Sequence, residues 1–201
     1  MINKYWDLII RECCIDKHDF EKEPFHIDVD VIRKIINKIG TPGQRKSSIL
    51  FRQTCREKRP DFFARNDLFL LPIKKGKYVI IKGEGYFNIP RVDSASINYK
   101  SRLTFELDTA IIDNSATQHI DFAFAISMLK TFMKDESLVL TIRGRKYTPA
   151  FSFHVGEYKI HVESVQTEVD AGYEGEKQVA LVEAKNKDVS DVIIRQLFYP
   201  F

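Results

Sequence analysis

A short apolar strand that ends in opposite charges is the feature that most limits what this chain can form. Residues 179–182 are apolar on both faces, as in a central strand of a sheet, and Glu183, Ala184 and Lys185 follow directly. Because side chains alternate along a strand, Glu183 and Lys185 lie on one face, roughly 6.6–7 Å apart along it. We therefore expect a carboxylate and an ammonium group at the end of a buried strand.

A second carboxylate lies upstream, at Asp170. Residues 158–170 are expected to form one long strand, in which Gln166, Glu168 and Asp170 share a face. If this strand and residues 179–185 are neighbours in a hairpin, Asp170 and Glu183 lie side by side.

Two close carboxylates repel each other unless a positive charge lies between them. Mg²⁺ fits this position because it prefers oxygen ligands, so the predicted ligands are Asp170, Glu183 and the backbone carbonyl of Ala184. Lys185 would then orient or deprotonate the attacking water and neutralise charge on a phosphate. These groups are suited to hydrolysing a phosphodiester bond, although the same pattern also fits a solvated strand end with no catalytic role.

Charge is distributed unevenly along the 201 residues. Residues 33–82 hold 14 Lys and Arg against three acidic residues, a net charge of +11, whereas residues 156–191 have a net charge of −5. The basic stretch would attract a polyanion such as DNA, and the acidic stretch would attract cations. Two ordinary solvated faces remain the alternative.

The basic stretch has a predicted order of elements. An amphipathic helix around residues 5–10 precedes a helix over residues 31–39 that Asp28 or Asp30 caps. A basic helix from Thr41 to before Pro60 and a hairpin with strands at 68–73 and 78–82 complete a winged-helix-like order. A passive basic subdomain remains the alternative. The residues expected to contact DNA here are Arg45, Lys46, Arg52, Lys74, Lys75 and Lys77.

The remainder of the chain follows a boundary expected near residues 90–100. A largely buried helix is predicted over residues 117–134, followed by strands at 137–142 and 149–155 that flank a turn at 143–146. After the two strands described above, a closing helix starts near Ser190 and Asp191. Since a helix in an α/β unit normally leads to another strand, we expect the chain to be the N-terminal portion of a longer protein.

Asp170, twelve intervening residues and Glu183-x-Lys185 after an apolar strand resemble the PD-(D/E)xK nuclease motif, with Val169 in place of the usual proline. The order helix, strand, strand, strand, helix resembles the restriction-endonuclease-like core. Residues 195–199 resemble the helix after the ExK strand. The segments "TIRGRKYTPAFSF" and "VQTEVDAGYEG" are similar to bacterial type II restriction endonucleases.

The resemblance implies an α/β (α+β) fold with a mixed sheet. It places a basic, winged-helix-like DNA-binding region at residues 1–95 and a nuclease core, cut short at its C-terminal end, at residues 96–201. The implied activity is Mg²⁺-dependent cleavage of double-stranded DNA at a short specific sequence. The implied partners are a second copy of the chain and, genetically, a DNA methyltransferase.

The resemblance also implies roles for individual residues. The catalytic residues would be Asp170, Glu183 and Lys185. Glu168, Gln166 and Gln196 would surround the metal ligands without binding the ion. Further contacts to DNA would come from Arg143, Arg145 and Arg195.

Two other functions fit the same residues: a DNA-binding regulator with a degenerate nuclease-like core, and a repair or RNA-processing nuclease. The three cysteines lack the spacing of a zinc site. The N-terminus has neither a signal peptide nor a membrane span, so a cytoplasmic location without a membrane partner is predicted.

Overall fold

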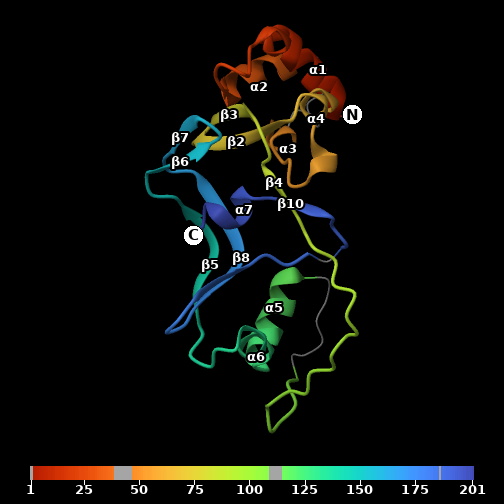
Figure 1. The fold of residues 1–201 in the computed structure, drawn as a ribbon, viewed down its shortest axis with the longest axis vertical. Coiled ribbons are helices and arrows are strands. Elements are labelled where there is room, and N and C mark those ends of the chain that lie inside the picture. Colours follow the sequence, from red (N-terminus) through yellow and green to blue (C-terminus); the bar gives the residue numbers. More distant parts are fainter. Residues whose placement is uncertain (1, 39–46, 109–114, 186) are drawn as a thin grey trace. The chain divides into compact units, whose positions relative to one another are not determined.

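The computed structural model describes residues 2–38, 47–108, 115–185 and 187–201, which fall into two units. The first unit comprises Met1–Asn88, Tyr147–Gln166 and Asp191–Arg195. The second comprises Ile89–Lys146, Thr167–Ser190 and Gln196–Phe201. The protein is α+β, with short helices and small sheets (Figure 1), and the predicted mixture of helices and strands is confirmed at this level.

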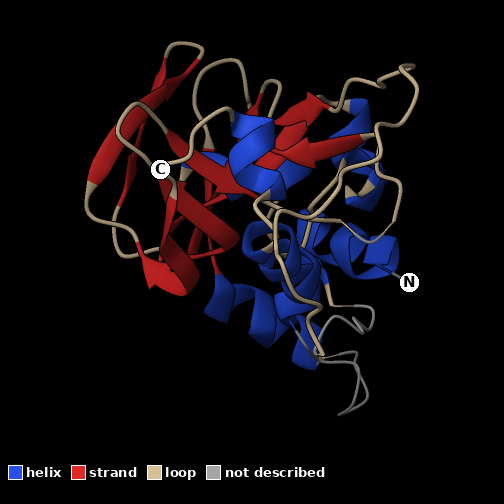
Figure 2. Ribbon diagram, turned by 90° about the horizontal axis from the view of Figure 1, so that it is seen from below, coloured by secondary structure: helices blue, strands red, loops and turns tan. Residues whose placement is uncertain are grey.

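Most of the helices and strands belong to the first unit, and Figure 2 colours helices and strands differently. Its helices are α1 (Ile2–Glu12), α2 (Val29–Asn37), α3 (Ser47–Leu50) and α4 (Asp61–Arg65), with 3₁₀ turns η1 (Ile15–Lys17) and η3 (Arg56–Lys58). Its strands are β1 (Phe25–Asp28), β2 (Leu68–Lys74), β3 (Lys77–Lys82), β4 (Tyr86–Asn88), β6 (Phe151–Val155), β7 (Tyr158–Val162) and β10 (Asp191–Ile193). They form a sheet of order β1–β3–β2 and the antiparallel pairs β10–β4 and β6–β7.

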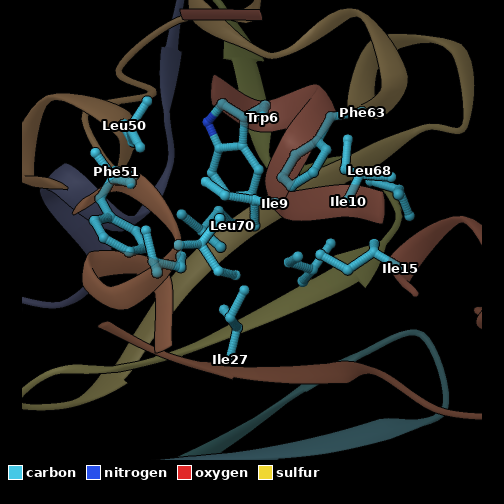
Figure 3. Close-up of a cluster of buried hydrophobic side chains, with 14 residues drawn as sticks. Trp6, Ile9, Ile10, Ile15, Ile27, Leu50, Phe51, Phe63, Leu68 and Leu70 are labelled. Carbon is cyan, nitrogen blue, oxygen red and sulfur yellow. The ribbon is translucent and has the colours of Figure 1, made fainter. Parts of the chain in front are cut away.

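Helix α1 contributes a tryptophan to the core of the first unit. Trp6, Ile9 and Ile10 are spaced three and four residues apart and therefore lie on one face of the helix, as predicted. The ring centroids of Trp6 and Phe63 are 4.8 Å apart, and both side chains are fully buried (Figure 3). Ile80 of β3 belongs to the same cluster, so helices and sheet share one apolar core.

Helix α2 begins at the predicted cap. The Asp28 carboxylate accepts the backbone N–H of Asp30 at 2.8 Å, which satisfies a donor that the first turn leaves free. Three isoleucines with helical spacing are buried: Ile32, Ile35 and Ile36. The prediction of a helix here is confirmed.

The predicted hairpin is formed by β2 and β3, which pair antiparallel with Leu70 opposite Ile80. Gly76 in its two-residue turn takes a φ of +75°, in the left-handed region that favours glycine. The Gly76 carbonyl also accepts the backbone N–H of Val29 at 2.8 Å. The turn is therefore tied to the start of α2.

The prediction of a basic helix between Thr41 and Pro60 is wrong for the described part of this range. Only α3 and η3 are helical there, and residues 51–55 are irregular. The carbonyl of Thr54 instead accepts the backbone N–H of Ile193 at 3.0 Å. Pairing with a segment distant in sequence outweighs the local helical preference.

The predicted start of the closing helix is wrong. Residues 191–193 form strand β10, which pairs antiparallel with β4. Asp191 is buried, and its carboxylate accepts the backbone N–H of Arg56 at 2.8 Å. The Arg56 guanidinium lies 3.5 Å from Asp191 and 2.9 Å from the exposed Glu84. This network attaches the β4–β10 ribbon to the first unit.

The second unit contains α5 (Ala116–Ala125), α6 (Met128–Met133), most of β5 (Val139–Tyr147), most of β8 (Gln166–Glu174), β9 (Val179–Val182) and most of α7 (Arg195–Phe198). Its sheet has the order β5–β8–β9, and β8 and β9 pair antiparallel. Gly172 of β8 is required by this packing, because a Cβ there would lie 2.7 Å from a side-chain atom of Ile142 in β5.

The single long helix expected over residues 117–134 is replaced by α5 and α6. Ser127 takes a φ of +64°, and its backbone N–H closes the last turn of α5 by donating to Phe124 at 2.9 Å. Within this stretch only Ile120 and Ile126 are buried, and Phe132 is 78 % exposed. The largely buried helix is therefore also wrong.

Two further expectations about strands are wrong. Strand β5 continues through residues 143–146, where a turn was expected, and Gly144 with a φ of +73° absorbs the irregularity. The strand expected over residues 158–170 is divided into β7 and β8 at Ser164, whose φ is +51°. The Ser164 backbone N–H donates to the carbonyl of Thr148 at 3.3 Å, so tertiary pairing stabilises this break.

The buried core of the first unit gives a stability prediction. We expect Ile80→Ala to lower the free energy of unfolding by about 2–5 kcal/mol, because it removes fully buried methyl groups and leaves a cavity. The matched control Ile97→Ala, at a side chain that is 93 % exposed, should change it by less than about 0.5 kcal/mol. Urea denaturation followed by circular dichroism measures both, and equal effects would contradict the packing described.

The buried ion pair gives a second prediction. Asp191→Ala should lower the free energy of unfolding by about 2–4 kcal/mol, because the Arg56 N–H and guanidinium lose a desolvated partner. Glu84→Ala removes the exposed carboxylate from the same guanidinium and should cost about 1 kcal/mol or less. Thermal and urea unfolding compare the variants, and a larger loss for Glu84→Ala would overturn the role given to Asp191.

Candidate functional site

The β8–β9 hairpin determines where Asp170 and Glu183 lie. Ala171 is opposite Val182 at the end of the ladder, and the register continued by one position places Asp170 opposite Glu183. Opposite residues of antiparallel strands have Cβ atoms about 4.5–5.5 Å apart. The hairpin that the sequence predicted is confirmed, although β9 ends at Val182, so Glu183 and Lys185 follow the strand.

Asp170 is held by the chain that follows β9. Its half-buried carboxylate accepts the backbone N–H of Ala184 through Oδ2 at 2.8 Å. Ala184 itself packs against the buried cluster that includes Tyr173 and Leu138. The carboxylate of Asp170 is therefore fixed by a backbone group that is anchored in the core.

Glu183 is held by two side-chain donors on one oxygen. Lys185 Nζ and Gln196 Nε2 both contact Glu183 Oε1, the latter at 3.0 Å. The side chain of Glu183 is 14 % exposed and that of Lys185 is 30 % exposed, so the pair is shielded but accessible. The ammonium group offsets the cost of desolvating the carboxylate.

One buried oxygen beside this pair lacks a hydrogen-bond partner among the described residues. Gln196 Oε1 is inaccessible to solvent and accepts no hydrogen bond from any residue that the structure describes. Burying an amide oxygen without a donor is costly, so such a group favours a bound water or cation that the protein atoms do not replace.

The donor set fits a hard divalent cation. Among the described residues no donor contacts Asp170 Oδ1 or Glu183 Oε2, which leaves one oxygen of each carboxylate available. Carboxylate, amide and backbone oxygens together with waters are the ligands of Mg²⁺. Within the described ranges no group of three or more His, Cys, Asp or Glu side chains could hold a metal, so any ion here would depend on two carboxylates and neutral oxygens.

Glu168, Arg143 and Arg145, which were also predicted near this site, each form an ion pair. Glu168 Oε2 accepts from Arg145 Nε at 3.2 Å, and both side chains are more than half exposed. The Arg143 guanidinium contacts both carboxylate oxygens of Asp121 on α5, one of them at 3.3 Å. Arg143 and Arg145 thus lie on strand β5 and attach to carboxylates, instead of extending from a turn.

The predicted DNA contacts in the first unit are more dispersed. Lys74, Lys75 and Lys77 flank the exposed turn of the β2–β3 hairpin, and Arg52 is exposed after α3. Arg195 and Gln166 line a pocket of this unit with Lys74 and Lys75. Arg45 and Lys46 lie outside the described residues.

Sequence patterns did not indicate the aromatic part of that pocket. Phe51 and Tyr78 stack there with ring centroids 4.0 Å apart and an interplanar angle of 15°. Burial raises the pKa of the Tyr78 hydroxyl above its ordinary value. The only sequence signal was an aromatic residue next to basic residues, as at Lys77-Tyr78 and Lys146-Tyr147.

Two protein-family models match this chain, one in each part of the sequence. A model described as domain of unknown function DUF6997 matches residues 81–201. The chain belongs to the DUF6997 family. A second model, domain of unknown function DUF6996, matches residues 3–80. Searches of curated proteins and of solved structures gave no match.

The DUF6997 match covers Asp170, Glu183, Lys185 and Gln196, so the candidate site lies wholly within the region that this family defines. The limit between the two family matches falls inside strand β3. None of the described helices has the length and apolarity needed to cross a membrane.

Proposed function

We propose that this protein is a Mg²⁺-dependent endonuclease that hydrolyses double-stranded DNA at a short specific sequence, as a type II restriction endonuclease does. The observation that carries the proposal is the grouping of Asp170, Glu183 and Lys185 at one end of the β8–β9 hairpin, with Asp170 fixed by the Ala184 N–H. Two carboxylates and an ammonium group in this order form the chemical set of a phosphodiesterase.

Each side chain of the site would have a separate role in hydrolysis. Asp170 and Glu183 would hold the cation through their available oxygens, together with the Ala184 carbonyl. Bound Mg²⁺ supplies Lewis acidity at a phosphate oxygen and lowers the pKa of water. Lys185 would donate to the phosphate as its charge develops, and Gln196 would keep the Glu183 carboxylate oriented.

The order of elements in the second unit supports the same assignment. Within the second unit, helices α5 and α6 precede strands β5, β8 and β9, and helix α7 follows, so the order is helical pair, strand, strand, strand, helix. With the helical pair in place of a single first helix, this is the order of the restriction-endonuclease-like core that the sequence resembles. The finer fold, including a winged-helix-like arrangement around the β2–β3 hairpin, is part of the proposal.

The basic first unit would bind the DNA. Lys75 and Lys77 lie in or beside an exposed hairpin turn, where ammonium groups can reach phosphates. A homodimer would match a palindromic target, and a DNA methyltransferase would protect the host. Both belong to the proposal, as does a cytoplasmic location.

Cleavage of plasmid DNA by three variants tests the proposal. With Mg²⁺, the wild-type chain should produce discrete bands, and Asp170→Asn, Glu183→Gln and Lys185→Ala should each slow cleavage about 10²-fold or more, because each removes charge stabilisation in the transition state. Chelation of Mg²⁺ should abolish cleavage.

The matched control is Glu174→Gln, which removes an exposed carboxylate at the other end of β8. It should leave the rate within about twofold of wild type, as surface substitutions away from a site do. Undiminished cleavage by Asp170→Asn would sink the proposal. DNA binding without metal or cleavage would indicate a regulator, and smeared DNA or loss of RNA would indicate a repair or RNA-processing nuclease.

A further inference from the structure

A second candidate site lies entirely within the first unit. It is a pocket of about 240 Å³ between the β2–β3 turn, the Tyr147 end of β5, the first residue of β8 and Arg195. This volume is below the range of about 300–1,000 Å³ that holds drug-sized ligands. The pocket can therefore enclose only part of a nucleotide-sized ligand, and it is too small for a duplex.

The charges around this pocket favour an anion. Lys74, Lys75 and Arg195 line it, and none of the described residues in its lining carries a carboxylate. Lys74 Nζ is partly neutralised by Glu163 Oε2 at 2.9 Å, and this contact lowers the pKa of the Glu163 carboxyl. Lys75 and Arg195 add an ammonium group and a guanidinium to the lining, and this combination is well suited to phosphate.

The remaining walls favour a flat, unpaired ring. Tyr147 lines the pocket with a side chain that is 61 % exposed, so its ring is accessible to a ligand. The stacked pair of Phe51 and Tyr78 forms another wall. Gln166 adds an exposed amide that can both donate to and accept from a base edge.

We propose that this pocket binds a single nucleotide, with its phosphate at Lys75 and Arg195 and its unpaired base against Tyr147. Aromatic rings next to cationic groups are the arrangement by which proteins hold unpaired nucleotides. The ligand is either a free nucleotide or a nucleotide turned out of a DNA duplex, and the second source rests on the proposed function. In that case the pocket positions DNA, apart from the hydrolytic residues.

Calorimetry on the full chain tests the pocket with three probes: a deoxynucleoside monophosphate, the matching deoxynucleoside and inorganic phosphate. The monophosphate should bind to one site per chain and more tightly than either fragment. Tyr147→Ala should weaken it about fivefold or more, because stacking of a base on an aromatic ring contributes about 1–3 kcal/mol. Lys75→Gln should weaken it severalfold through loss of a phosphate contact.

The matched control is Lys82→Gln, which removes the same charge from the same hairpin at an exposed residue that is not a predicted DNA contact and does not line this pocket. It should leave the affinity for the monophosphate within about twofold. Equal loss in Lys75→Gln and Lys82→Gln would show general electrostatic attraction and overturn the site. Circular dichroism confirms that each variant is folded.

A fluorescent base analogue distinguishes the two sources. A duplex with one unpaired 2-aminopurine, bound with Ca²⁺ in place of Mg²⁺, should change fluorescence with wild type and much less with Tyr147→Ala. If only the free monophosphate binds, its source is the free nucleotide. Failure of both probes overturns the pocket proposal, whereas plasmid cleavage separately decides the proposed nuclease.

Discussion

The hydrogen bond from the Ala184 backbone N–H to the Asp170 carboxylate determines how the candidate site is built. It joins the end of β9 to β8 just beyond the Ala171–Val182 pair, where the ladder stops. Ala184 packs on the buried cluster, so its N–H cannot be displaced without disturbing apolar contacts. A backbone donor of this kind orients a carboxylate more rigidly than a flexible side chain would, which is what a metal ligand requires.

Glu183 is positioned in a different way, and the difference has a functional consequence. Its contacts with Lys185 and Gln196 come from side chains that can rotate, and both use the same carboxylate oxygen. A cation that approached the other oxygen would compete with Lys185 for the charge of Glu183. The ammonium group would then be available for a phosphate, so binding of the ion and contact with the substrate would be coupled. In the proposed site, Asp170 would therefore be a fixed ligand and Glu183 an adjustable one.

The sequence predicted correctly those features that depend on a single residue, such as a helix cap or a turn. Asp28 caps α2 and Gly76 forms the hairpin turn, because capping and left-handed φ are properties of single residues. Alternation predicted which side chains share a face, and the pairing of β8 with β9, which the sequence left as one possibility, brings Asp170 and Glu183 to one end. The errors arose where pairing between distant segments decides the structure. Asp191 is a suitable helix cap by composition, yet it is buried against Arg56 in a strand, which no local pattern indicates. The breaks at Ser127 and Ser164 likewise depend on left-handed residues other than glycine, for which sequence gives little warning.

The central claim is that Asp170 and Glu183 share one divalent cation, and a crystal structure of the full chain grown with Mn²⁺ tests it most directly. Anomalous scattering locates Mn²⁺ independently of any assumption about the site. The account predicts one strong anomalous peak with oxygen atoms of both Asp170 and Glu183 within about 2.0–2.3 Å, as for a carboxylate-bound ion of this size. A saturated crystal with no peak between these two carboxylates, or with manganese bound only elsewhere on the chain, would contradict it.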